Sequence, residues 1–142
     1  MKLTDEQLLA AIWVNQLKKL SKNVTHLYVG GGTGVCDDDE FWYESASSEH
    51  RVWREKVTDK IKPPQLLKRL RQLTAAKLIK FRDETIFFID DDRALKAFKD
   101  ARQFWLDHGV PTGVKNNKCL TAMVDRDAIA EKCEAFLMAR YL

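Results

Sequence analysis

Four polar side chains between residues 65 and 72 have the types and the spacing needed to bind nucleic acid. In an α-helix, where successive residues turn by about 100°, Gln65, Lys68, Arg71 and Gln72 lie on one side. Glutamine, lysine and arginine donate hydrogen bonds to base edges, and the two cations also bind phosphate oxygens. An α-helix fits the major groove of B-DNA. This stretch therefore predicts a helix that contacts duplex DNA.

The distribution of charge along the chain favours the same interpretation. Residues 51–82 hold eleven Lys or Arg and two Asp or Glu, although the formal net charge of the chain is only +3. Residues 1–50 hold four and eight, respectively. Such a block inside a segment with apolar periodicity predicts a folded cationic surface. The alternative is an ordinary helical domain whose solvated face carries the cations, and RNA stays open as an alternative to DNA.

Two helices are predicted before residue 63. A capping box at residues 4–7 and the apolar spacing that follows predict a helix over residues 5–20. Residues 45–48 are rich in serine and predict the cap of a second helix over residues 49–60. Between the two helices, residues 21–47 are interpreted as an inserted loop with a short strand, or as a hairpin.

The polar face belongs to a predicted helix over residues 64–77. Pro63 and Pro64 end the preceding helix, and proline is well tolerated at the first helical position. The opposite side of this helix carries an apolar stripe of four leucines, at positions 66, 67, 70 and 73. Residues 78–89 then form two β-rich runs joined by Asp83 and Glu84, which predicts a hairpin with a tight turn.

This order of elements resembles the winged helix-turn-helix family. The run from Leu66 to Ile79 is similar to that family's recognition helix and its exit into the first wing strand, although Lys77 stands where a glycine is common. The resemblance covers residues 5–20 and 48–90. It implies a mainly α fold with a small β-hairpin (α+β), in which helix 64–77 lies in the major groove and wing 78–89 contacts the backbone.

Three groups of residues are expected to contact DNA, from the recognition helix, from the segment before it and from the wing. The cations outside the recognition helix are expected near phosphates, where they provide affinity and salt dependence. The three groups are Gln65, Lys68, Arg69, Arg71 and Gln72; Arg51, Arg54, Lys56, Lys60 and Lys62; and Lys80 and Arg82.

The C-terminal part of the chain is predicted to be a helical extension. Residues 1–90 are expected to form the winged-helix-like domain, and residues 91–142 hold helices 93–107 and 126–142 joined through a loop over 109–118. Their apolar positions are more numerous than a minimal winged helix requires. We therefore expect a homodimer, with folding back on the same chain as the alternative.

The segment between residues 30 and 43 holds two further features. The glycines at residues 30–34 lack the lysine–serine ending of a phosphate-binding loop, so a flexible loop is expected. An acidic and aromatic run follows, and it favours an alternative function: a protein-interaction module or an inhibitor of a nucleic-acid enzyme, of phage or mobile-element type. Its candidate partner-binding residues are Asp37, Asp38, Asp39, Glu40, Phe41, Trp42 and Tyr43.

The sequence gives no sign of an enzyme. No nucleophile, base and orienting group can be assembled, and no spacing of Cys, His or acidic residues indicates a metal or another cofactor. Cys36, Cys119 and Cys133 are expected to be reduced and buried. The acidic N-terminus and the lack of long apolar runs predict a cytoplasmic protein without membrane spans. We expect a DNA-binding transcriptional regulator.

Overall fold

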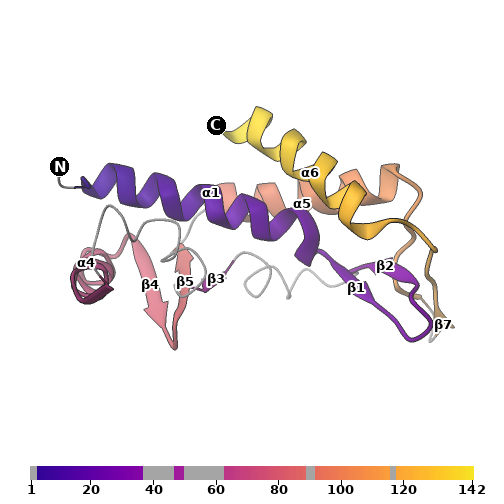
Figure 1. Cartoon of the computed structure of the whole chain (residues 1–142), viewed down its shortest axis with the longest axis horizontal. Coiled ribbons are helices and arrows are strands. Elements are labelled where there is room, and N and C mark those ends of the chain that lie inside the picture. Colours follow the sequence, from indigo (N-terminus) through magenta and orange to yellow (C-terminus); the bar gives the residue numbers. More distant parts are fainter. Residues whose placement is uncertain (1–2, 37–46, 50–62, 89–91, 116–117) are drawn as a thin grey trace. The chain divides into compact units, whose positions relative to one another are not determined.

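The computed structural model shows a mainly helical fold with small antiparallel sheets (Figure 1). This confirms the expected α+β class. The structure describes residues 3–36, 47–49, 63–88, 92–115 and 118–142.

The chain divides into two compact units. The first comprises Met1–Gln16 and Ser47–Asp91, and the second comprises Leu17–Ala46 and Asp92–Leu142. The segment that was interpreted as an insertion therefore belongs to the same unit as the C-terminal helices.

The first unit begins with the N-terminal part of α1 (Asp5–Asn23). Thr4 Oγ1 accepts a hydrogen bond from the backbone N–H of Gln7 (3.1 Å), and Gln7 Oε1 accepts one from the N–H of Thr4 (2.9 Å). This reciprocal capping box satisfies two amides that the helix leaves without partners. The fully buried Leu8 and Ile12 lie about one turn apart. The predicted first helix is confirmed, and it extends three residues further, to Asn23.

Helix α4 (Pro63–Ala75) ends in a tight C-terminal turn. The N–H of Lys77 bonds to the Thr74 carbonyl (3.0 Å), and the N–H of Leu78 bonds to the Leu73 carbonyl (3.1 Å). These are the two bonds of a Schellman motif, which requires a residue in the left-handed region. Lys77 fills that position with φ 60°, and the chain then enters the hairpin.

The hairpin consists of β4 (Ile79–Arg82) and β5 (Thr85–Phe88), as predicted. Asp83 and Glu84 form its two-residue turn with φ of 50° and 64°, the backbone of a type I′ turn. Figure 1 shows this hairpin beside α4.

A third strand, β3 (Ser48–Glu49), pairs with β5, so that the strand order is β3-β5-β4. Ser48 lies opposite Ile86 and Glu49 opposite Thr85. The expectation that Ser48 caps a helix beginning at Glu49 is therefore wrong. Without β3, the outer edge of β5 would leave backbone groups unpaired, and the extended segment satisfies them. The rest of that expected helix lies outside the described residues.

The core of the first unit lies between α1, α4 and the hairpin. Gln16 of α1 is fully buried, and its Nε2 donates a hydrogen bond to the Ile86 carbonyl of β5 (3.4 Å). Burial of apolar side chains stabilises this arrangement by roughly 1.5–3 kcal/mol for each large residue. The buried apolar residues of α4 and the hairpin are Leu66, Leu70, Leu73, Ile79 and Ile86.

The second unit contains a hairpin of β1 (Thr25–Leu27) and β2 (Thr33–Val35), so the hairpin alternative for the insertion is confirmed. Helix α5 (Asp92–Asp107) follows the first unit. Strands β6 (Val114–Lys115) and β7 (Lys118–Cys119) replace part of the loop that was expected over residues 109–118.

The last helix, α6 (Arg126–Tyr141), begins where the sequence predicts. Asp125 Oδ1 accepts a hydrogen bond from the Ala128 N–H (3.1 Å), which is a standard N-cap.

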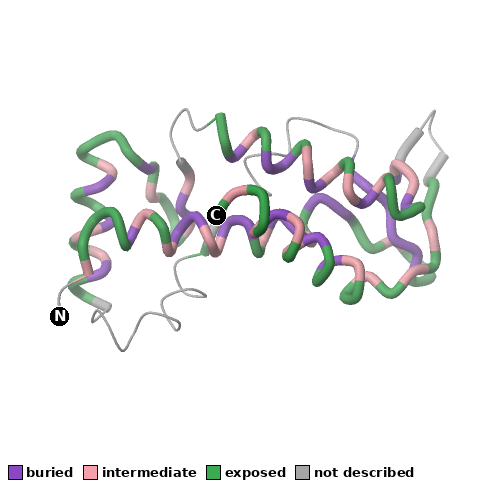
Figure 2. Tube along the Cα trace, turned by 90° about the horizontal axis from the view of Figure 1, so that it is seen from above, coloured by how far each residue is buried: buried purple, intermediate pink, exposed green. Residues whose placement is uncertain are grey.

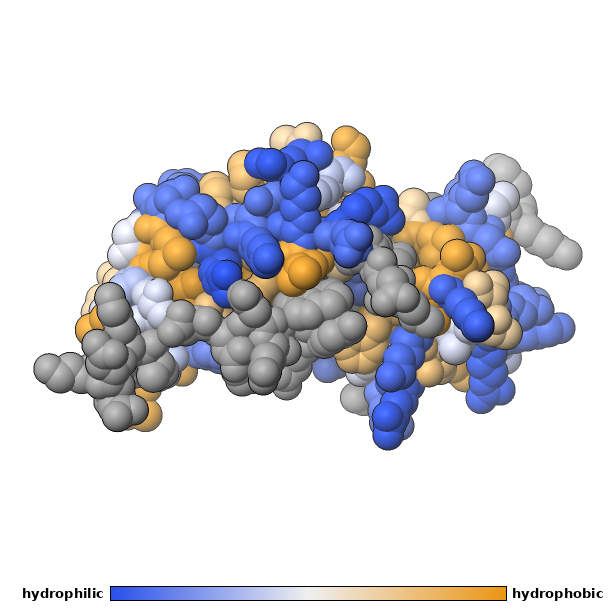
Figure 3. All heavy atoms as spheres, turned by 180° about the vertical axis from the view of Figure 1, so that it is seen from behind, coloured by the Kyte–Doolittle hydropathy of each residue, from blue (hydrophilic) through white to orange (hydrophobic). Residues whose placement is uncertain are grey.

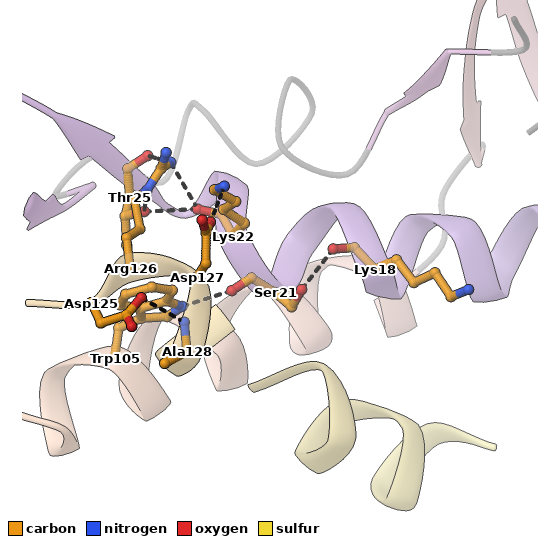
Figure 4. Close-up of polar contacts among 9 residues, drawn as sticks. All are labelled: Lys18, Ser21, Lys22, Thr25, Trp105, Asp125, Arg126, Asp127 and Ala128. Atoms are coloured by element: carbon orange, nitrogen blue, oxygen red, sulfur yellow. Dashed lines mark hydrogen bonds and ion pairs between the residues drawn. The ribbon is translucent and has the colours of Figure 1, made fainter. Parts of the chain in front are cut away.

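A polar cluster fixes the end of α1 to α5 and α6 (Figure 4). The buried Trp105 donates from Nε1 to the Ser21 carbonyl (2.8 Å). Arg126 donates to Thr25 Oγ1 (3.0 Å) and to the Thr25 carbonyl (3.2 Å). These bonds satisfy backbone and side-chain acceptors where α1 ends.

The apolar faces of α5 and α6 pack within the second unit. Phe98 and Trp105 of α5 and Leu137 of α6 are fully buried, and the rings of Phe104 and Phe136 stack with centroids 5.2 Å apart. These side chains therefore pack within the second unit, and the homodimer stays a prediction.

The glycine run is a structured turn and a packing site, which corrects the expectation of a flexible loop. Gly30 and Gly31 have φ of 93° and 89° at the tip of the β1–β2 hairpin. A Cβ on Gly34 would lie 2.5 Å from Gly113 Cα and 2.9 Å from the Tyr28 ring. Only glycine fits this approach, because real Cβ atoms essentially never come so close.

Candidate nucleic-acid interface

The two sides of α4 differ as the sequence predicts. Gln65, Lys68, Arg71 and Gln72 are all exposed, whereas Leu66, Leu70 and Leu73 are no more than 2% exposed. Leu67, the fourth leucine of the predicted stripe, is only half-buried and lines the outward face instead. Buried and exposed positions alternate in the same way along the other helices (Figure 2). Burial of the leucine stripe in the core thus turns the four polar side chains outward.

The outward face of α4 is purely cationic. The residues Pro63–Ala75 include no Asp or Glu. Neither Lys68 nor Arg71 forms an ion pair within the described parts of the chain. Two positive charges, with glutamines before and after them along the helix, are therefore available to an anionic ligand.

A shallow, open hollow of ≈ 540 Å³ runs along this face. Its lining is mostly apolar, with a smaller polar part. This mixture suits a base edge that offers hydrogen-bonding atoms beside a thymine methyl group. The described residues that line the hollow are Pro64, Leu67, Lys68, Arg71, Gln72 and Ala75.

Arg69 lies away from this face and is held by the N-terminal segment. Its Nη2 forms an ion pair with Asp5 Oδ1 (2.5 Å), and its Nη1 donates to the Leu3 carbonyl. The Arg69 side chain is only 21% exposed. In the structure, this expected DNA contact therefore connects α4 to the start of α1. No local pattern in the sequence indicates this pairing, because the two residues are 64 positions apart.

Lys80 and Arg82, the two expected contacts on the wing, are both exposed on β4. Arg82 Nε lies 3.5 Å from Asp83 Oδ2 at the turn. Glu84, the other turn residue, is also exposed. The sequence pattern predicts Asp83 and Glu84 only as a turn, and it does not indicate that the Asp83 carboxylate lies beside Arg82.

Two groups of candidate residues lie outside the described residues. The first is the set of cations before α4, and the second is the acidic and aromatic run of candidate partner-binding residues. They are Arg51, Arg54, Lys56, Lys60 and Lys62, and Asp37, Asp38, Asp39, Glu40, Phe41, Trp42 and Tyr43.

Other features of the described surface carry less chemical information. Hydrophobic areas lie between hydrophilic ones on the face that Figure 3 shows, which is normal for a folded chain. Within the described residues, no group of three or more His, Cys, Asp or Glu side chains is placed to hold a metal ion. The described helices include none that is both long and apolar enough to cross a membrane.

Comparisons with protein-family models, with curated proteins and with solved structures found no match to this chain. The α4 face and its surroundings are therefore the basis for assigning a function.

Proposed function

We propose that the first unit binds duplex DNA in the manner of a winged helix-turn-helix module, with α4 in the major groove. The observation that carries this proposal is the outward face of α4, which combines two exposed glutamines with two exposed cations and has no carboxylate of its own. Neither cation forms an ion pair with another described residue. A helix with this face contacts base edges and phosphates at once.

The elements around α4 support the proposal. The helix is followed directly by the β4–β5 hairpin, in the order that the family resemblance implies. Strand β3 pairs with β5 and so anchors the hairpin from its other side. The ion pair between Arg69 and Asp5 connects α4 to the start of α1, away from the outward face. A precise contact with DNA requires such fixed positioning of the helix.

The glutamines and the cations of the outward face have different roles in binding. Gln65 and Gln72 are suited to hydrogen bonds with base edges, for which glutamine and adenine are a common pair. Lys68 and Arg71 neutralise phosphates or bind guanine, and they supply the salt-dependent part of the affinity. A small protein that discriminates base sequence in this way is suited to regulating transcription.

The test is fluorescence anisotropy of a labelled random duplex over a salt series. The variant is Lys68→Ala/Arg71→Ala, and the matched control is Lys96→Ala/Lys99→Ala, which removes the same charge from exposed positions of α5. We expect wild-type binding at low salt, a loss of about tenfold or more in the α4 variant, and a change within about twofold in the control.

The salt dependence gives a second criterion. If both α4 cations contact phosphates, the slope of log K against log salt should become shallower by about two in the α4 variant. A wild-type chain that does not bind at low salt would refute the proposal. So would an equal loss in the α4 variant and the control, because that result would indicate a general effect of net charge.

A further inference from the structure

The tip of the β4–β5 hairpin is acidic and projects into solvent. Asp83 and Glu84 are the only two residues of the turn, and both are exposed. The side chains of Arg82 and Asp83 are 75% and 89% exposed. Arg82 Nε lies 3.5 Å from Asp83 Oδ2. This carboxylate beside one of the two wing cations offsets part of the attraction of Arg82 for phosphate.

The backbone at this tip is unfavourable for the residues that occupy it. Both φ angles are positive, at 50° and 64°, and a type I′ turn is usually built from Asn-Gly or Asp-Gly. The left-handed region is unfavourable for glutamate, because its Cβ lies too close to the following carbonyl oxygen. Local strain that is not needed to make the turn itself points to a role for the side chains.

The charges of the first unit are divided unequally between its helix and its hairpin. Within β4, β5 and their turn, the cations Lys80 and Arg82 are matched by the anions Asp83 and Glu84. Helix α4 has cations and no anion. If α4 contacts DNA, its neighbouring hairpin therefore adds no net attraction, and its tip presents two negative charges to any phosphate that it approaches.

We infer that the Asp83–Glu84 tip is a repulsive element that keeps the wing away from the DNA backbone and limits binding to random sequence. This inference rests on the proposed function and deepens it. Phosphate contacts supply most of the affinity for non-specific DNA. Repulsion at the wing lowers that affinity and leaves the hydrogen bonds of α4 to bases largely unchanged, which raises discrimination between sequences.

The experiment measures random-duplex affinity for Asp83→Asn/Glu84→Gln at about 50 mM salt, a concentration at which electrostatic contacts are strong. These substitutions keep the size of both side chains and remove two charges. The matched control is Glu131→Gln/Glu134→Gln on α6 of the second unit, which changes net charge equally. We expect the wing variant to bind about threefold to tenfold more tightly than wild type, and the control to differ by less than about twofold.

A graded series sharpens the test. Glu84→Gln should tighten binding less than Glu84→Lys, and both gains should shrink as salt rises, because screening weakens the repulsion. Thermal unfolding of each variant checks that the fold is retained.

The possible outcomes separate the two proposals. If binding depends on Lys68 and Arg71 but the wing variant behaves like its control, this inference is wrong and the proposed function stands. If the wild type does not bind DNA, both are wrong.

Discussion

Replacing Gly34 by alanine is expected to destabilise the second unit by about 3 kcal/mol. The added methyl group would lie 2.5 Å from Gly113 Cα, 2.9 Å from the Leu120 carbonyl oxygen and 2.9 Å from the Tyr28 ring. Two of these neighbours are backbone atoms and the third is a packed ring, so none can turn aside as a flexible side chain would. The cost should therefore fall at the upper end of the range for overpacking, which is roughly 1–3 kcal/mol.

Gly30→Ala is a matched control from the same hairpin. A Cβ at Gly30 meets no atom within 4 Å, but the backbone φ is 93°. The substitution therefore adds strain without a clash. Strain of roughly 1–2 kcal/mol is partly offset by the lower entropy of the unfolded chain, which leaves a loss of about 1 kcal/mol. The two variants should differ by about 2 kcal/mol, or roughly thirtyfold in the unfolding equilibrium constant.

Urea unfolding followed by circular dichroism measures the two losses. Hydrogen exchange of the Gly113 amide, which bonds to the Val35 carbonyl at 2.8 Å, reports on the same packing locally. If Gly34→Ala is no less stable than Gly30→Ala, the close approach of the two backbones does not limit this position, and the reasoning is refuted.

Two further predictions concern the end of α4 and a buried thiol. Lys77→Gly should raise the free energy of unfolding by about 1 kcal/mol, because glycine adopts the left-handed backbone at φ 60° without strain. Lys77→Ala, the control, should not raise the free energy of unfolding. A loss of stability in Lys77→Gly, measured by urea unfolding, would contradict the Schellman turn. Burial raises the pKa of the Cys133 thiol from 9.0 to about 12, so iodoacetamide at pH 9 should label Cys133 only after unfolding, as peptide mass spectrometry can show. Because the folded pKa is the higher one, the stability that this thiol contributes is present below pH 9 and is lost as pH rises toward 12. Rapid labelling of Cys133 in the folded protein would contradict its burial.

The features that the sequence predicted correctly are all local. The capping box needs only Thr4 and Gln7 three residues apart at the helix start, and the two faces of α4 follow from the 3.6-residue period of its leucines. The turn at Asp83–Glu84 follows from two β-rich runs with two residues between them. Each of these depends on residues within about one or two helical turns of one another, so neighbouring side chains decide the outcome.

The features that the sequence left undecided depend on partners far along the chain. Arg69 has the type and position of a DNA contact, and only the folded chain brings Asp5 and the Leu3 carbonyl to it. Ser48 and Glu49 resemble a helix start, but the open edge of β5 makes them a strand. A glycine run does not by itself favour one backbone conformation. Gly34 must be glycine because the Gly113 backbone packs against it, and this contact forms only in the folded chain.

The sequence by itself thus determined the chemistry of the candidate interface, namely which polar side chains share one side of α4 and that this side carries no carboxylate. The tertiary structure decided which cations are available, because Arg69 is engaged by Asp5 and Arg82 lies beside Asp83, whereas Lys68 and Arg71 remain exposed. The physical reason is that helical periodicity relates residues a few positions apart in the sequence. Ion pairing depends on distance in space, and residues far apart in the sequence come close only when the chain folds.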